Sequence, residues 1–236
     1  MMKSGRGDNR KVAIGVAAIA VVGAILVLTL YVMQNTSRVT STGTSIGAPD
    51  PRLAYLTILP GYAVLGLRNA TVTIFEFGDF QCPTCDNWFK TQEPQVLQNL
   101  VDTGRANFVW RDFEYYGIDS TNASQAAYAA GEQGKFWQFY DLLYTNQGGI
   151  NSGWANKANL FGFAQSLGLN MTQFGSSFNG GKYLNMVTTN FNDGKKLGIT
   201  GTPTFFVVGP HGKVVEIIGS QPYSVFQDTV NSMLNG

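Results

Sequence analysis

The stretch Glu76-Phe-Gly-Asp-Phe-Gln-Cys-Pro-Thr-Cys85 contains the only two cysteines of the chain, three positions apart and directly after an apolar segment. β-branched and aromatic side chains dominate residues 71–77, which is typical of a strand. Pro83 suits the first turn of a helix, where its missing N–H costs nothing. The stretch therefore predicts a strand that leads through a short turn into a helix, with Cys82 at the helix N-terminus.

This placement predicts a redox-active dithiol. Unpaired N–H groups and the partial positive charge at a helix N-terminus lower the pKa of a thiol. We expect Cys82 to be the exposed nucleophile that forms a mixed disulfide with a substrate protein, and Cys85 to be the buried thiol that resolves it. A cross-link between residues so close in sequence removes little entropy from the unfolded chain, so a disulfide here would stabilise the fold only slightly.

Two other uses of the cysteines stay open at this point. They are small apolar residues that a core can bury, and they can supply two ligands of a metal ion. Zinc prefers four ligands and the chain has one histidine, His211, so we expect no intramolecular zinc site. A soft ion such as Cu(I), or the binding of exported clients without catalysis, needs only the dithiol.

Patterns on both sides of the dithiol predict an α/β domain over residues 61–236. Helical spacing without a strand signal fills residues 118–198 and predicts a helical insertion. A strand, a helix and another strand of the observed lengths imply parallel pairing of the two strands. The other predicted elements are strands over 62–67, 106–113, 204–208 and 213–218, and helices over 83–102 and 223–234.

The N-terminus carries a membrane signal. Residues 1–11 hold four basic side chains, Lys3, Arg6, Arg10 and Lys11, and an uncharged apolar run follows over residues 12–33. A helix of about 22 residues, about 33 Å long, spans the hydrocarbon core of a bilayer. The run exceeds the apolar region of a signal peptide, and no clear cleavage site follows it, so we expect a retained anchor.

The basic residues before the span predict a single-pass protein of the cell membrane with residues 1–11 in the cytoplasm. A Ser, Thr, Gly and Pro-containing segment then predicts a flexible tether over residues 34–60, with the α/β domain outside the cytoplasm. Four Asn-x-Ser/Thr motifs, which accept glycans only on the exported side, occur at Asn35, Asn69, Asn122 and Asn170. These motifs are short enough to arise by chance.

Composition argues against a nucleic-acid partner. The formal net charge is +1, and Lys and Arg form no dense cluster beyond the N-terminus. Nucleic acids need a basic patch to neutralise their phosphates, so we expect no such binding.

Three segments resemble one known family. Val-Thr-Ile-Phe-Glu-Phe-Gly-Asp-Phe-Gln-Cys-Pro-Thr-Cys (72–85) resembles the active-site region of the DsbA-like thiol-disulfide oxidoreductases of the thioredoxin superfamily. Leu-Gly-Ile-Thr-Gly-Thr-Pro-Thr-Phe-Phe-Val (197–207) is similar to the family's cis-proline loop, and Gly-Lys-Phe-Trp-Gln-Phe-Tyr (134–140) to a helix of its inserted domain. The resemblance covers the chain from about Leu65 to its end and implies a thioredoxin-like fold with a helical insertion.

The resemblance also implies roles for residues beyond the cysteines. It implies a cis bond between Thr202 and Pro203, in a loop that packs against the dithiol, with the main chain of Thr202 binding an extended substrate strand. An ordinary trans proline before an edge strand is the alternative. Glu76 matches the family's buried acid, which would have a raised pKa and relay a proton to Cys85, unless it is a partly solvated acid at a strand end.

Pro83 and Thr84 depart from the family's best-known member, which has histidine between its cysteines. Without that positive partner we expect a less acidic Cys82 and a less oxidising disulfide than in a histidine version.

These observations predict an extracytoplasmic thiol-disulfide oxidoreductase that forms disulfides in exported proteins. The expected partners are exported protein thiols and a membrane or soluble redox partner that resets the dithiol. No cofactor is expected beyond the disulfide between Cys82 and Cys85, and no metal. A reductase or isomerase supplied with electrons by a membrane donor is the alternative within the same fold.

Overall fold

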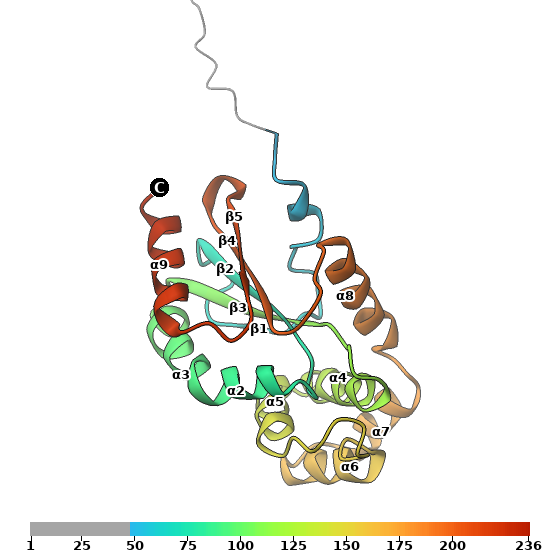
Figure 1. Cartoon of the computed structure of the whole chain (residues 1–236). Helices are drawn as coiled ribbons and strands as arrows, with labels where there is room; N and C mark the ends of the chain where they lie inside the picture. Colours follow the sequence, from blue (N-terminus) through green and yellow to red (C-terminus); the bar gives the residue numbers. More distant parts are fainter. Residues whose placement is uncertain (1–47) are drawn as a thin grey trace, which may run out of the picture. The chain divides into compact units, whose positions relative to one another are not determined.

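Within residues 48–236, which the computed structural model describes, a mixed sheet of five strands forms the centre of the domain (Figure 1). Its spatial order is β1 (Val64–Leu65), β3 (Ala106–Asp112), β2 (Val72–Gly78), β4 (Thr204–Val208) and β5 (Val214–Ile218). β2 and β3 are parallel, as predicted, and the other neighbouring pairs are antiparallel. The domain is therefore an α/β fold of the thioredoxin-like type.

The expectations for the N-terminus fall outside this range. The cytoplasmic tail over 1–11, the membrane span over 12–33 and the motif at Asn35 all lie outside the described residues. Among helices of residues 48–236, none combines the length and the apolar character that a membrane crossing requires.

β2 is the central strand because both of its faces are apolar. Val72 and Ile74 project to one face together with Glu76, and Phe75 and Phe77 project to the other. All five side chains are buried. Continuous apolar composition of this kind is typical of a strand that is covered on both sides.

The face of β2 that carries Glu76 packs against three helices: α2 (Pro83–Thr91), α3 (Glu93–Val96) and α9 (Tyr223–Leu234). Trp88 of α2 is the centre of this layer. Its ring lies 4.6 Å from that of Phe205 and 5.6 Å from that of Phe226. This aromatic contact holds the start of α2, and with it the two cysteines, against the end of the sheet.

The prediction of one continuous helix over residues 83–102 is wrong. The segment is divided into α2, α3 and the π-helix η2 (Leu97–Val101). The cause is Pro94, which lacks the N–H that would donate to the carbonyl of Lys90. The break places Glu93 at the start of α3 with its side chain buried.

The opposite face of the sheet packs against α8 (Leu184–Lys196) and the segment before β1. The flexible tether expected over 34–60 is therefore wrong in its C-terminal part. Pro51–Ala54 forms a 3-10 helix that Asp50 caps, and Leu56 is buried among Phe75 and Phe206. Burial of Leu56 and a hydrogen bond from Arg111 to the carbonyl of Tyr55 order this segment.

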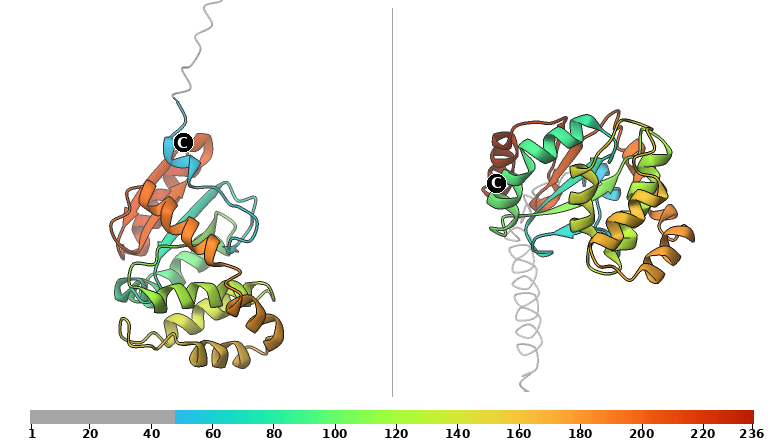
Figure 2. Two further views of the ribbon diagram at one scale, coloured as in Figure 1. Left: turned by 90° about the vertical axis from the view of Figure 1, so that its right-hand side faces the viewer. Right: turned by 90° about the horizontal axis from the view of Figure 1, so that it is seen from below.

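Five helices lie between β3 and β4 in the sequence. They are α4 (Ile118–Gly131), α5 (Phe136–Thr145), α6 (Lys157–Ser166), α7 (Met171–Asn179) and α8. Figure 2 shows α4 to α7 gathered beside the N-terminal end of α2. Small residues such as Ala126, Ala127 and Ala130 let the other helices approach α4 closely, and their shared core includes Phe80, Cys82 and Cys85. The dithiol thus lies where the helical unit meets the sheet.

Candidate active site

Cys82 and Cys85 are two free thiols at the start of α2. Cys82 is the N-cap residue, and the backbone N–H of Cys85 donates to its Sγ at 3.4 Å. The expectation of an exposed Cys82 is wrong, because the residue is 2% exposed and Cys85 is fully buried. Thr202 covers the sulfur of Cys82, and the side chain of Gln147 in the helical unit donates a hydrogen bond to the Cys82 carbonyl.

The two thiols have opposite pKa shifts. A hydrogen bond from the Cys85 side chain is the largest of the effects that lower the pKa of Cys82 to about 6, against a smaller opposing effect of burial. The Thr202 side chain and the backbone N–H groups of Cys85 and Thr84 also lower it. Burial raises the pKa of Cys85 well above its ordinary value, and the charges of Cys82 and Glu76 raise it further. Cys82 is thus suited to be a thiolate, and Cys85 to hold a proton.

The loop before β4 completes the site from a distant part of the chain. The peptide bond between Thr202 and Pro203 is cis. The thiol of Cys82 donates to the carbonyl of Thr202 at 3.3 Å, across 120 residues of sequence. Pro203 is buried and Thr202 is half-buried, so the backbone of Thr202 borders the sulfur directly.

Glu76 lies on the central strand and is fully buried. It is not the partly solvated acid that was the alternative. Burial raises its pKa well above the ordinary value, and the nearby charges of Glu93 and Cys82 act in the same direction, while a hydrogen bond from Tyr140 opposes them. The structure therefore brings together Cys82, Cys85, Glu76 and the loop with Thr202, as the sequence suggested.

Pro83 and Thr84 are both exposed at the first turn of α2. Thr84 acts on Cys82 through its backbone N–H, which helps to lower the thiol pKa. The effect of its side chain, relative to histidine, stays a prediction.

Asp79 ties the turn before Cys82 to the helical unit. Its carboxylate accepts hydrogen bonds from the backbone N–H groups of Gln81, Tyr115 and Tyr116 and from the hydroxyl of Ser120, at 2.6 to 3.1 Å. This is the role of a turn residue, and it orients the loop that presents the cysteines.

Sequence reasoning missed Glu93 and Tyr140. Tyr140 is part of the segment 134–140 that resembles a helix of the family's inserted domain, and Glu93 is part of the helix expected over 83–102, but neither was assigned a role in the site. A signal for Glu93 exists, because it lies four residues after Phe89 and three before Val96, on the apolar face of its helix. An acid at such a position is rarely left unpaired.

A metal centre finds few ligands here. Within residues 48–236, no group of three or more His, Cys, Asp or Glu side chains is placed to hold a metal ion. His211 lies between β4 and β5, beyond the Thr73 end of β2, whereas the cysteines follow the opposite end.

Residues 59–227 match the family described as Thioredoxin. The probable disulfide bond formation protein D of Bacillus cereus is 30% identical over 149 residues, which cover 61% of this chain and 69% of that protein. The chain belongs to the DsbA-like thiol-disulfide oxidoreductases of the thioredoxin family. The oxidised crystal structure of BdbD from Bacillus subtilis has a TM-score of 0.67 and 25% identity, and the match covers 75% of this chain and 94% of that one.

A second group of relatives is much longer. The Na+/H+ antiporter NhaA 1 of Salinispora arenicola is 33% identical over 171 residues, which are 70% of this chain and 25% of that protein. The chain therefore spans about a quarter of the length of this relative.

Proposed function

We propose that this chain is an extracytoplasmic thiol-disulfide oxidoreductase that forms disulfides in exported proteins, tethered to the membrane through residues 12–33 with its N-terminus in the cytoplasm. The observation that carries the proposal is the asymmetry of the dithiol. Cys82 has a pKa of about 6 at a helix N-terminus, and Cys85 is buried with a raised pKa. The name of the Bacillus cereus relative, which refers to disulfide bond formation, supports the same direction.

The proposed reaction has two exchange steps. A client thiolate attacks Sγ of Cys82 in the Cys82–Cys85 disulfide, so that the bond between the two cysteines breaks, a mixed disulfide forms, and Cys85 leaves with the electron pair and takes up a proton. A second client thiolate then attacks the client's own sulfur in the mixed disulfide. The client disulfide forms, and Cys82 leaves as a thiolate, which its low pKa favours.

The two exchange steps require a redox partner for this chain. The client loses two electrons and the dithiol gains them, so a separate redox partner must accept them to restore the Cys82–Cys85 disulfide. The Thr202 backbone, 3.3 Å from Sγ of Cys82, is placed to bind an extended client segment beside the reacting sulfur.

Trapping of the mixed disulfide tests the proposal. The oxidised full chain is mixed with a peptide that contains two thiols, and oxidation of the peptide is followed beside the Cys82→Ser and Cys85→Ser variants. We expect oxidation by the wild type only. In Cys85→Ser, Cys82 is first converted to a mixed disulfide with thionitrobenzoate, and a peptide with a single thiol is added. The peptide thiolate should attack Sγ of Cys82 and release the thionitrobenzoate anion, so that a stable peptide adduct accumulates on Cys82. An adduct on Cys85, or peptide oxidation by Cys82→Ser, would contradict the assigned roles.

The reduction potential and the metal content separate the alternatives. A potential well below that of the cellular thiol pool, together with cysteines that are reduced in the cell, would instead support a reductase or isomerase. Stoichiometric Cu(I) in the purified chain without exchange activity would support a metal-binding module.

A further inference from the structure

Three buried side chains form a hydrogen-bonded chain behind the dithiol. The hydroxyl of Tyr140, on α5, lies 2.9 Å from Oε2 of Glu93 on α3 and 3.4 Å from Oε2 of Glu76 on β2. Glu76 and Tyr140 are fully buried, and Glu93 is 3% exposed. Two carboxyl groups thus share one phenol in the core of the domain.

This arrangement holds a proton beyond the one on the phenol. A hydroxyl group has one hydrogen and can donate it to one carboxylate at a time. The second contact is a hydrogen bond only if the other carboxyl is protonated and donates to the phenol oxygen. Like charges this close also disfavour double ionisation, so the two acids titrate as a pair.

One end of the chain faces the cysteines. Oε1 of Glu76 is buried and has no hydrogen-bond partner within residues 48–236. A Cβ placed on Gly78 would lie 3.2 Å from this oxygen, so it is directed along β2 toward the turn that leads to Cys82. Burial raises the pKa of the Cys85 thiol at this end, and the charges of Cys82 and Glu76 raise it further.

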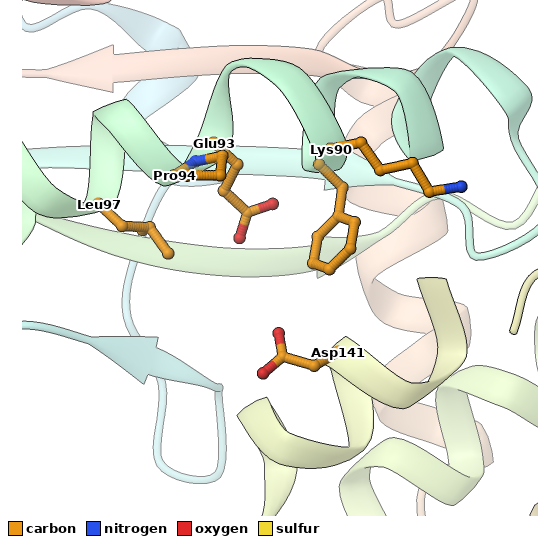
Figure 3. Close-up of a pocket in the computed structure, with 6 residues that line it drawn as sticks. Lys90, Glu93, Pro94, Leu97 and Asp141 are labelled. Atoms are coloured by element: carbon orange, nitrogen blue, oxygen red, sulfur yellow. The ribbon is translucent and has the colours of Figure 1, made fainter. Parts of the chain in front are cut away.

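The other end faces water. Glu93 lines a pocket of about 380 Å³ together with Phe89, Lys90, Pro94, Leu97 and Asp141. Lys90, Pro94 and Asp141 are exposed, so the pocket is open to solvent. Figure 3 shows the carboxyl groups of Glu93 and Asp141 on facing walls, pointing toward one another.

We propose that Glu93, Tyr140 and Glu76 form a proton relay that connects this pocket with Cys85. The inference rests on the proposed function and adds its proton supply. When Cys85 leaves as a thiolate, Glu76 gives it a proton, Tyr140 passes its proton to Glu76, and Glu93 passes one to Tyr140 and takes a proton from water in the pocket. Reoxidation of the dithiol runs the same transfers backwards. Glu76 serves the reacting sulfur, and Tyr140 and Glu93 act through it as positioning residues.

The charged and titratable groups around the relay are consistent with proton transfer from the pocket at Glu93 to Cys85. The N-cap residue Cys82 and Cys85 of α2 interact electrostatically with Glu76. Tyr144 of α5 lies beside Tyr140, and Asp141 of α5 and Lys90 of α2 border the same pocket as Glu93. Burial raises the pKa of Glu93 to about 8, against the hydrogen bond from Tyr140 and with a smaller contribution from the charge of Asp141. The protonated pair is therefore present at neutral pH and is lost in alkaline solution.

The test is the pH profile of one exchange step. Reduction of the oxidised full chain by a dithiol peptide is followed by stopped-flow fluorescence from pH 5 to pH 10, and each rate constant is divided by the thiolate fraction of the peptide. The wild-type profile should fall above about pH 8, where the relay loses its proton. Glu93→Gln removes the like charge beside Glu76 and should move the inflection of the pH–rate profile about one pH unit lower. On the falling part of the profile, the variant should therefore react about tenfold more slowly than the wild type. Tyr140→Phe removes a hydrogen bond that favours the ionised carboxyls and should move it higher.

Two controls make the result specific. Asp102→Asn makes a similar acid-to-amide change at an exposed position and should keep the wild-type profile. The pKa of Cys82 should stay at about 6 in every variant, since neither Glu93 nor Tyr140 is among the groups that shift it. If either Glu93→Gln or Tyr140→Phe keeps the wild-type inflection, the three groups do not act as one relay and the proposal fails. A wild-type chain without exchange at any pH would instead refute the proposed function itself.

Discussion

Replacement of Cys85 by alanine tests what makes Cys82 acidic. The hydrogen bond from the Cys85 side chain is the largest of the effects that lower the pKa of Cys82 from 9.0 to about 6. A hydrogen bond to a charged group contributes about 1.5–3 kcal/mol, which is about 1–2 pKa units. Cys85→Ala should therefore raise the pKa of Cys82 to about 7–8. Cys85→Ser retains a donor at this position and should keep the pKa closer to 6.

The measurement is the ultraviolet absorbance of the thiolate, followed through pH 4–10 in the reduced full chain and checked by the rate of alkylation at Cys82. Cys82→Ser gives the background. A pKa near 6 in Cys85→Ala would refute the reasoning, because the helix N-terminus and Thr202 would then account for the whole shift. Equal pKa values in the alanine and serine variants would show that the donor of residue 85 has no effect.

The same shift determines how stability depends on pH. The folded-state pKa of this thiol is depressed, so the stabilisation is complete above pH 9 and is lost as the pH falls through about 6. It amounts to about 1.4 kcal/mol at pH 7, which favours the reduced dithiol by about 30 mV. In urea unfolding, the stability difference between the reduced wild type and Cys82→Ser should grow by about 2.6 kcal/mol from pH 5 to pH 8. A difference that is independent of pH would contradict the linkage.

Three further changes test the rest of the site and its support. Thr84→His places a cation beside Cys82 and should lower its pKa by about one unit and raise the reduction potential, and an unchanged or raised thiolate pKa would contradict this prediction. Glu93 has a raised pKa, so its contribution to stability is complete below pH 4.5 and is lost as the pH rises to about 8. Glu93→Gln has no charge to bury and should avoid this loss. In urea unfolding, its free energy of unfolding relative to that of the wild type should rise by about 4 kcal/mol between pH 4 and pH 8. If the unfolding free energies of the two proteins change with pH in parallel, Glu93 does not carry a buried charge at pH 8. Trp88→Ala removes the centre of the layer between the sheet and its helices and should cost about 3–5 kcal/mol, and a cost below about 1 kcal/mol would show that the layer collapses around the gap.

Part of the site was accessible from local sequence. The strand, the turn and the start of α2 depend on side chains within about 15 residues. These are the continuous apolar, β-branched and aromatic side chains of β2, Gly78, and Pro83 at the first helical turn. Local propensity is enough to place both cysteines at a helix N-terminus. The family resemblance added Thr202 and Pro203, whose position 120 residues away no periodicity could supply.

The exposure of Cys82 could not be predicted in this way. A helix N-terminus is usually open to water, but here the helical unit and the loop at Thr202 close over it. The break of the long helix follows from one missing N–H at Pro94, which the pattern of apolar residues does not register.

By itself, the sequence determined the α/β class, the parallel pairing of β2 with β3 and the dithiol at the start of α2, because each depends on the period and the chemistry of neighbouring residues. Only the tertiary structure decided what surrounds the sulfurs. Glu76, Glu93 and Tyr140 come from a strand and two helices that are distant in sequence, and their contact depends on how those elements pack. Burial then sets their pKa values, since the loss of water around a carboxyl is a property of the whole domain and not of the chain near it.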